Sequence, residues 1–141
     1  MREDYLITIR GTMEQDGESD KVELITRGNF VQRGRSYYIT YQETEATGYK
    51  DCVTTVKVEG DEKVSMLRYG PAPSQLIIEK GRRHVCHYET GVGSLSLGVA
   101  ADAIESRLTD KGGRVRFSYL LDVDTSSISR NVVDITVRPV Q

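Results

Sequence analysis

Apolar and polar residues alternate along most of the chain, in short runs separated by turn-forming residues. The clearest case is the stretch 87–123, in which alternate positions carry Leu95, Leu97, Val99, Ala101 and Ala103, and then Val115, Phe117, Tyr119, Leu121 and Val123. Successive side chains of a strand point to opposite faces, so each half presents one apolar face. Residues 109–113 between them have turn composition. The pattern predicts a long β-hairpin with one face toward a core.

The same alternation predicts further strands on both sides of this hairpin. They cover residues 5–13, 22–30, 37–45, 53–59, 64–68, 75–79, 83–88 and 132–138. A polar, acidic loop is expected at residues 14–20 and a turn region at 46–51. Gly28 lies inside a predicted strand, where glycine is typical of a bulge or a close approach of two backbones.

One segment suits two kinds of structure. Residues 99–108 are favourable for a helix by intrinsic propensity. The preceding residues 94–97 alternate strictly between polar and apolar, and a hairpin with 115–123 needs a strand here. We therefore favour a strand over a helix for this segment.

About ten short strands and no firm helix predict an all-β protein. Strands that are neighbours in sequence usually pair, which gives an antiparallel meander. A meander of this length is expected to curl and close, because closure removes its exposed edges. We predict a single domain over residues 1–141 that forms an up-and-down, lipocalin- or calycin-like β-barrel, with a two-sheet sandwich as the alternative.

Composition narrows the function classes. A formal net charge of −2 disfavours a general nucleic-acid binder, which usually carries a basic excess. The sequence has no apolar run long enough to span a membrane, so we expect no membrane partner. Charged residues occupy the N-terminal stretch where a signal peptide would be apolar, which favours a cytoplasmic protein. Cys52 and Cys86 are far apart in sequence, and we expect both to be reduced thiols.

Short motifs near the ends of predicted strands resemble those of a known family. They are Tyr41-Gln42-Glu43, Arg68-Tyr69-Gly70, and Tyr88-Glu89-Thr90-Gly91 with Gly93. Together with the order of the hairpins, they are similar to the YwiB-like family of small bacterial proteins, over nearly the whole chain. The resemblance implies a calycin-type, lipocalin-like barrel in the cytoplasm, with no established biochemical activity.

Five residues are candidates for ligand binding: Tyr41, Glu43, Arg68, Tyr88 and Thr90. Tyr41 and Glu43 are two apart on a predicted strand and so share a face. If that face is interior, Glu43 needs a partner, and we expect Arg68 to pair with it at one end of the barrel. The pair is either a polar anchor for a ligand, with tyrosines lining the pocket, or a structural ion pair that closes the barrel.

Motifs for metal, phosphate or covalent chemistry are weak. His84 and His87 face opposite sides of a strand, which makes a poor metal pair, so no metal or other cofactor is expected. The glycines of residues 91–94 lead into an alternating strand rather than into the helix that a phosphate-binding loop requires. The sequence also lacks the GxSxG motif of a nucleophile elbow.

Three classes of function follow, in decreasing order of preference. The first is a barrel that binds a small apolar or amphipathic ligand, because closed barrels of this size can enclose a cavity. The second is a protein-interaction or structural module that uses its outer face. The third is an enzyme, which a fold alone does not imply. The sequence does not name a ligand or an oligomeric state.

Overall fold

The computed structural model describes residues 3–89, 93–123 and 126–140. Its elements are β1 (Tyr5–Gln15), β2 (Glu18–Arg33), β3 (Ser36–Gln42), the 3₁₀ turn η1 (Glu45–Thr47), β4 (Val53–Glu59), β5 (Lys63–Tyr69), β6 (Ser74–Glu79), β7 (Arg83–Glu89), β8 (Ser94–Thr109), β9 (Gly112–Val123) and β10 (Ser126–Pro139). Each strand pairs antiparallel with its neighbour in sequence, and β1 pairs with β10, so the sheet closes into a barrel. The predicted all-β, up-and-down barrel is confirmed, and residues 99–108 are strand.

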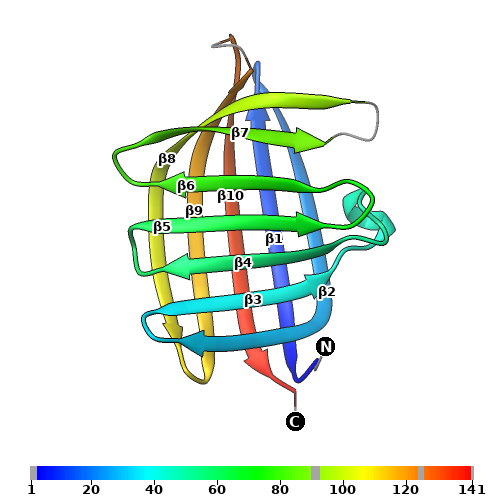
Figure 1. The fold of residues 1–141 in the computed structure, drawn as a ribbon, viewed down its shortest axis with the longest axis vertical. Helices are drawn as coiled ribbons and strands as arrows, with labels where there is room; N and C mark the ends of the chain where they lie inside the picture. Colours follow the sequence, from blue (N-terminus) through cyan, green and yellow to red (C-terminus); the bar gives the residue numbers. More distant parts are fainter. Residues whose placement is uncertain (1–2, 90–92, 124–125, 141) are drawn as a thin grey trace.

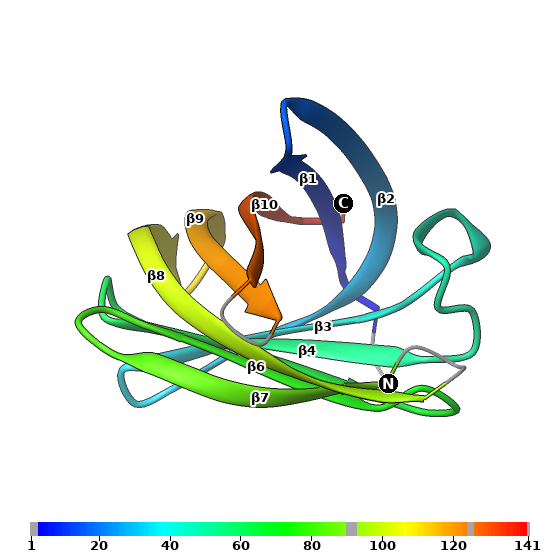
Figure 2. The same ribbon diagram turned by 90° about the horizontal axis from the view of Figure 1, so that it is seen from above.

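Two groups of strands cross each other in this barrel. In Figure 1, β3 to β7 run across the view, whereas β1, β9 and β10 run along the long axis of the molecule. The two longest strands, β2 and β8, bend to join both groups, as the view from above in Figure 2 shows. β2 pairs with β1 up to Gly28 and with β3 from Gly28 onward. The barrel therefore has a corner in β2 and a second corner in β8.

The corner in β2 depends on Gly28. This residue pairs with Tyr5 on one side and with Tyr41 on the other. A Cβ atom at Gly28 would lie closer than 3.0 Å both to the carbonyl oxygen of Thr40 and to Cδ1 of Ile7. Only glycine lets the backbones approach this closely, so the expected close-approach point is confirmed.

The corner in β8 contains a β-bulge between Ala101 and Ala103. Before the bulge, Val99 points into the core, and after it Ile104 does. The expectation that Ala103 shares the inward face with Val99 is therefore wrong, because the bulge inserts one residue and reverses the alternation. On the partner strand β9, Phe117 is buried together with the alternate residues on either side of it, as predicted.

Several predicted boundaries also change, and β10 begins at Ser126 rather than at residue 132. The segment 14–20 is not a loop: β1 continues to Gln15, β2 begins at Glu18, and a two-residue turn joins them. Asp16 and Gly17 both have positive φ, at 52° and 79°, which is the geometry of the tight hairpin turn that Asp-Gly favours. Similarly, β3 ends at Gln42 rather than at residue 45, because the chain turns into η1.

The core fills the space between the crossing strands. Its fully buried side chains include Ile7, Ile39, Val56, Val64, Ile78, Val99, Val115, Phe117 and Ile135. Cys52 and Cys86 are free and buried. The main-chain amide of Ile77 donates a hydrogen bond to Sγ of Cys86, at 3.4 Å. Among the described residues, β6 and β7 share the ladder pair of Ser74 with Tyr88, and a bridge joins Glu79 to Arg82, just before β7.

Candidate functional site

A row of polar residues crosses the sheet where β3 to β6 approach η1. Tyr41 pairs with Thr54, Thr54 with Arg68, and Arg68 with Ser74. The next row toward the middle of the sheet is apolar and consists of Ile39, Val56, Met66 and Leu76. The ladder register therefore places one polar row beside the apolar core, although the four strands contribute their members separately along the sequence.

The polar row forms one wall of a cavity of about 270 Å³, which we call the first cavity. Three predicted site residues, Tyr41, Glu43 and Arg68, line it. The remaining lining residues are Val22, Thr47, Tyr49, Thr54, Met66, Ser74, Leu76 and Tyr119. Val22 belongs to β2 and Tyr119 to β9, so the cavity lies inside the barrel between the crossing groups of strands.

Glu43 carries the most unusual polar atom of this cavity. Its main-chain amide donates to the carbonyl of Cys52 at 2.9 Å, which fixes the backbone just after β3. The hydroxyl of Thr54 donates to carboxylate oxygen Oε2 at 2.6 Å. The residue is only 9% exposed, and its other oxygen, Oε1, is buried with no hydrogen-bond partner among the described residues. The cavity wall thus holds a strong acceptor, Oε1, for which the described residues supply no hydrogen-bond donor within normal geometry.

Tyr41 lies directly between the core and this carboxylate. It is 4% exposed. Burial raises the pKa of its phenol far above the ordinary value, and the neighbouring Glu43 carboxylate raises this pKa further. Tyr41 is therefore a neutral side chain at any physiological pH. Its hydroxyl can donate or accept a hydrogen bond but does not supply charge.

Arg68 is 7% exposed and is held by two loops. Its Nε donates to the carbonyl of Ala72 at 2.6 Å, and its guanidinium carbon lies 3.5 Å from the centre of the Tyr49 ring. Such contacts stabilise a buried guanidinium by hydrogen bonding and by cation–π attraction. Tyr49 lies in the segment 46–51 that sequence analysis predicts only as a turn, which is why its role escaped prediction.

The expected ion pair between Glu43 and Arg68 is wrong. Within the described part of the chain, no such pair occurs: Glu43 takes Thr54 as its partner, and Arg68 takes a loop carbonyl. The reason lies in the order of the strands. β4 separates β3 from β5, and strands are spaced about 4.8 Å apart, so residues on β3 and β5 start about 10 Å from each other. The two residues share a cavity without touching.

The remaining two candidates are only partly described. The backbone of Tyr88 pairs with Ser74 and with Leu95, which continues the polar row by register. Its side chain, and the whole of Thr90, lie outside the described residues. Both stay predictions. Thr54 and Ser74, which sequence analysis missed, were recognisable only through the register that pairs them with Tyr41 and Arg68.

A second cavity of about 540 Å³ adjoins the first. β1, β2, β9 and β10 line it, with Gly11, Thr12, Met13, Asp20, Lys21, Val22, Tyr119, Asn131, Val132 and Val133. Val22 and Tyr119 line both cavities. The interior therefore offers a polar compartment and a larger, mainly apolar one that meet at these two side chains.

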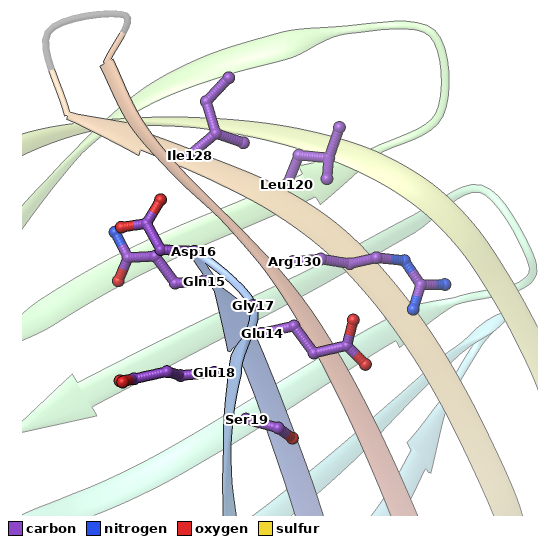
Figure 3. Close-up of a pocket in the computed structure, with 9 residues that line it drawn as sticks. All are labelled: Glu14, Gln15, Asp16, Gly17, Glu18, Ser19, Leu120, Ile128 and Arg130. Atoms are coloured by element: carbon purple, nitrogen blue, oxygen red, sulfur yellow. The ribbon is translucent and has the colours of Figure 1, made fainter.

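A third hollow, of about 320 Å³, lies at the tip of the β1–β2 hairpin. Glu14, Glu18 and Arg130 are among its lining residues (Figure 3). In Figure 3 the side chains of Glu14 and Glu18 extend to opposite sides, so these carboxylates do not converge on one point. Arg130 binds Asp102, at 3.0 Å. The described residues that line this hollow therefore give it weaker support as a binding site than Glu43 gives the first cavity.

Two further observations concern metal and membrane. His84 contacts Glu79, with Nε2 and Oε1 2.8 Å apart. Across residues 3–89, 93–123 and 126–140, no group of three or more His, Cys, Asp or Glu side chains is arranged to hold a metal ion. In the same part of the chain, no helix has the length and apolar character needed to cross a membrane.

Comparison with known proteins gives a consistent family and fold. Residues 7–135 match DUF1934, described as a domain of unknown function. The chain is 26% identical over 125 residues to the uncharacterized beta-barrel protein YwiB of Bacillus subtilis (strain 168), covering 87% of this chain and 86% of the relative. The crystal structure of the ywiB protein from Bacillus subtilis has a TM-score of 0.83 at 22% identity, over 99% of this chain and 93% of the other. The predicted YwiB-like family is confirmed, whereas a relation to calycins stays a prediction.

Proposed function

We propose that this chain, which belongs to the DUF1934 family, binds a small molecule inside the barrel, in the first cavity. The observation that supports the proposal is the buried, unpartnered Oε1 of Glu43. Leaving a buried acceptor unsatisfied costs about 1–3 kcal/mol, and more for a charged group. A ligand that donates a hydrogen bond to this oxygen recovers that free energy, so the folded protein is prepared for such a group.

The other lining residues suit an apolar or amphipathic ligand. Met66 and Leu76 supply apolar surface next to Glu43, and Tyr41 and Arg68 complete a polar end. Sites for small molecules commonly combine a mainly apolar lining with a few fixed polar groups. In this proposal Glu43 orients the ligand, and the apolar row of the sheet supplies most of the contact area.

We also propose that the protein works in the cytoplasm. The two cysteines are free and buried, whereas small exported domains commonly carry disulfides. A formal charge of −2 suits a ligand that is neither a nucleic acid nor a membrane surface.

An interaction module is the alternative function, and it draws on the outer face of the barrel. Leu120 of β9 and Ile128 of β10 are exposed and both border the hollow at the hairpin tip. Single exposed apolar residues are common on proteins, so these two give weaker support than the buried carboxylate.

The test uses N-phenyl-1-naphthylamine, a neutral fluorescent probe with two apolar ring systems and one N–H donor. We expect saturable binding at one site, with a rise in emission. Glu43→Met should weaken binding by about tenfold or more, because a hydrogen bond to a charged group contributes about 1.5–3 kcal/mol. Glu45→Met is the control, since Glu45 is exposed, outside the first cavity and paired with Lys50.

Two results would refute the proposal. One is the lack of saturable probe binding by the folded wild-type protein. The other is equal affinity in the wild type and Glu43→Met, with both shown to be folded by circular dichroism. Native mass spectrometry of freshly purified protein then identifies any natural ligand by its mass.

A further inference from the structure

The second cavity holds apolar surface that the protein itself leaves uncovered. Met13 and Val22 lie on the inward-facing positions of β1 and β2, yet they are 36% and 47% exposed. Neighbouring inward residues such as Ile7 and Leu24 are buried. Covering apolar surface is favourable in proportion to its area. An apolar chain lying in this cavity would cover both side chains.

The two cavities adjoin each other inside the barrel. They share Val22 and Tyr119, and the polar end with Glu43 belongs to the first cavity alone. A molecule whose polar group binds at Glu43 can therefore extend past Tyr119 into the second cavity. At about 540 Å³, the second cavity falls within the range of pockets that hold drug-sized ligands.

The charged residues that line the first cavity restrict which polar group a ligand can place there. Glu43 and Arg68 line the same cavity, where Glu43 accepts a hydrogen bond from Thr54 and Arg68 donates one to the carbonyl of Ala72, so the lining carries both signs of charge. A cationic group would be attracted to Glu43 but repelled by Arg68, and an anionic group would experience the reverse. An uncharged donor, such as a hydroxyl or a primary amide, binds the free oxygen of Glu43 without either repulsion.

We propose that the ligand is an elongated amphiphile with an uncharged hydroxyl or amide end at Glu43 and a linear apolar chain in the second cavity. This inference rests on the proposed function and names the ligand class of the same site. It predicts a dependence on chain length that a ligand confined to the first cavity would not show.

The test measures displacement of N-phenyl-1-naphthylamine by straight-chain alcohols, from 1-hexanol to 1-decanol. Affinity should rise about fourfold for each added methylene, because burying one contributes about 0.8 kcal/mol. 1-Decanol should bind more tightly than decylamine and more tightly than decanoate. An affinity that does not change with chain length, or tighter binding of either charged compound, would overturn the inference.

A matched pair of variants tests where the alkyl chain of the alcohol lies. Val22→Trp fills the junction of the two cavities, so 1-decanol should no longer bind this variant more tightly than 1-hexanol does. Ile25→Trp adds the same ring on the same strand at an exposed position outside both cavities, and should leave the advantage unchanged. Circular dichroism checks that both variants fold. If Val22→Trp keeps the full chain-length dependence, the chain does not lie in the second cavity.

Failure of this inference can be told apart from failure of the proposed function. Probe binding that depends on Glu43 but not on alcohol chain length leaves the proposed function intact and removes the inference. If neither the probe nor any alcohol binds, both are wrong.

Discussion

Replacing Gly28 with alanine tests the corner that places Tyr41 beside the first cavity. The added methyl group would lie closer than 3.0 Å to the carbonyl oxygen of Thr40 and to Cδ1 of the fully buried Ile7. The backbone oxygen cannot rotate away, so β2 and β3 must separate locally. Overpacking of this kind costs about 1–3 kcal/mol and sometimes more, and contact with backbone puts Gly28→Ala near the upper value, about 3 kcal/mol.

This cost converts into a measurable melting temperature. The entropy of unfolding is about 2.1 cal/mol/K per residue, or about 0.3 kcal/mol/K for 141 residues. A loss of 3 kcal/mol therefore lowers Tm by about 10 °C, which calorimetry or thermal circular dichroism resolves easily. Because Tyr41 pairs with Gly28, we also expect weaker probe binding in this variant.

Gly11→Ala is the matched control. Gly11 also lies within a strand, and a Cβ atom there would meet nothing within 4 Å. Its replacement should leave stability unchanged or raise it by up to about 1 kcal/mol, since alanine restricts the unfolded chain. If Gly28→Ala melts within about 2 °C of Gly11→Ala, the close approach of β2 and β3 at this corner is refuted.

Three further predictions concern the site and the thiols. Burial raises the pKa of Tyr41 in the folded state, so the unfolded state loses the phenol proton first as pH rises. The free energy of unfolding should therefore fall above about pH 10, by up to about 1.4 kcal/mol per pH unit. Urea titrations at several pH values should show that Tyr41→Phe lacks this contribution. Arg68→Met should lower the free energy of unfolding, measured in urea, by about 2–4 kcal/mol, because it removes a charged hydrogen bond and a cation–π contact. The same change at the exposed turn residue Arg35 should alter it by no more than about 0.5 kcal/mol, and equal effects would contradict the contacts assigned to Arg68. Thiol titration of the unfolded, unreduced protein should find both Cys52 and Cys86 free, and a count of zero would show a disulfide.

The barrel was predictable because alternation and turns are local signals. Each strand shows its inward face in its own sequence, and neighbours in sequence pair in space. The bulge between Ala101 and Ala103 was not predictable, because the residues there include no glycine or proline that would mark it. The Asp16-Gly17 turn had a clear signal, but the surrounding charges suggested a loop instead.

The candidate site was predictable only in part. Tyr41 and Glu43 do share an inward face with Arg68 at one end of the sheet, as the alternation predicts. Their partners depend on register, which a single sequence does not contain, so Thr54 was missed and Arg68 was assigned to the wrong partner. The second cavity is lined by both Val22 and Tyr119, residues far apart in the chain that no local pattern brings together.

The most direct test of ligand binding inside the barrel is NMR of protein labelled with ¹³C at the methionine methyl groups. The chain has three methionines, of which Met66 lines the first cavity and Met13 the second. Saturating 1-decanol should shift the methyl signals of both Met66 and Met13, whereas 1-hexanol should shift that of Met66 alone. If saturating 1-decanol leaves both signals where they are in the free protein, no ligand of this class enters the barrel and the account is wrong.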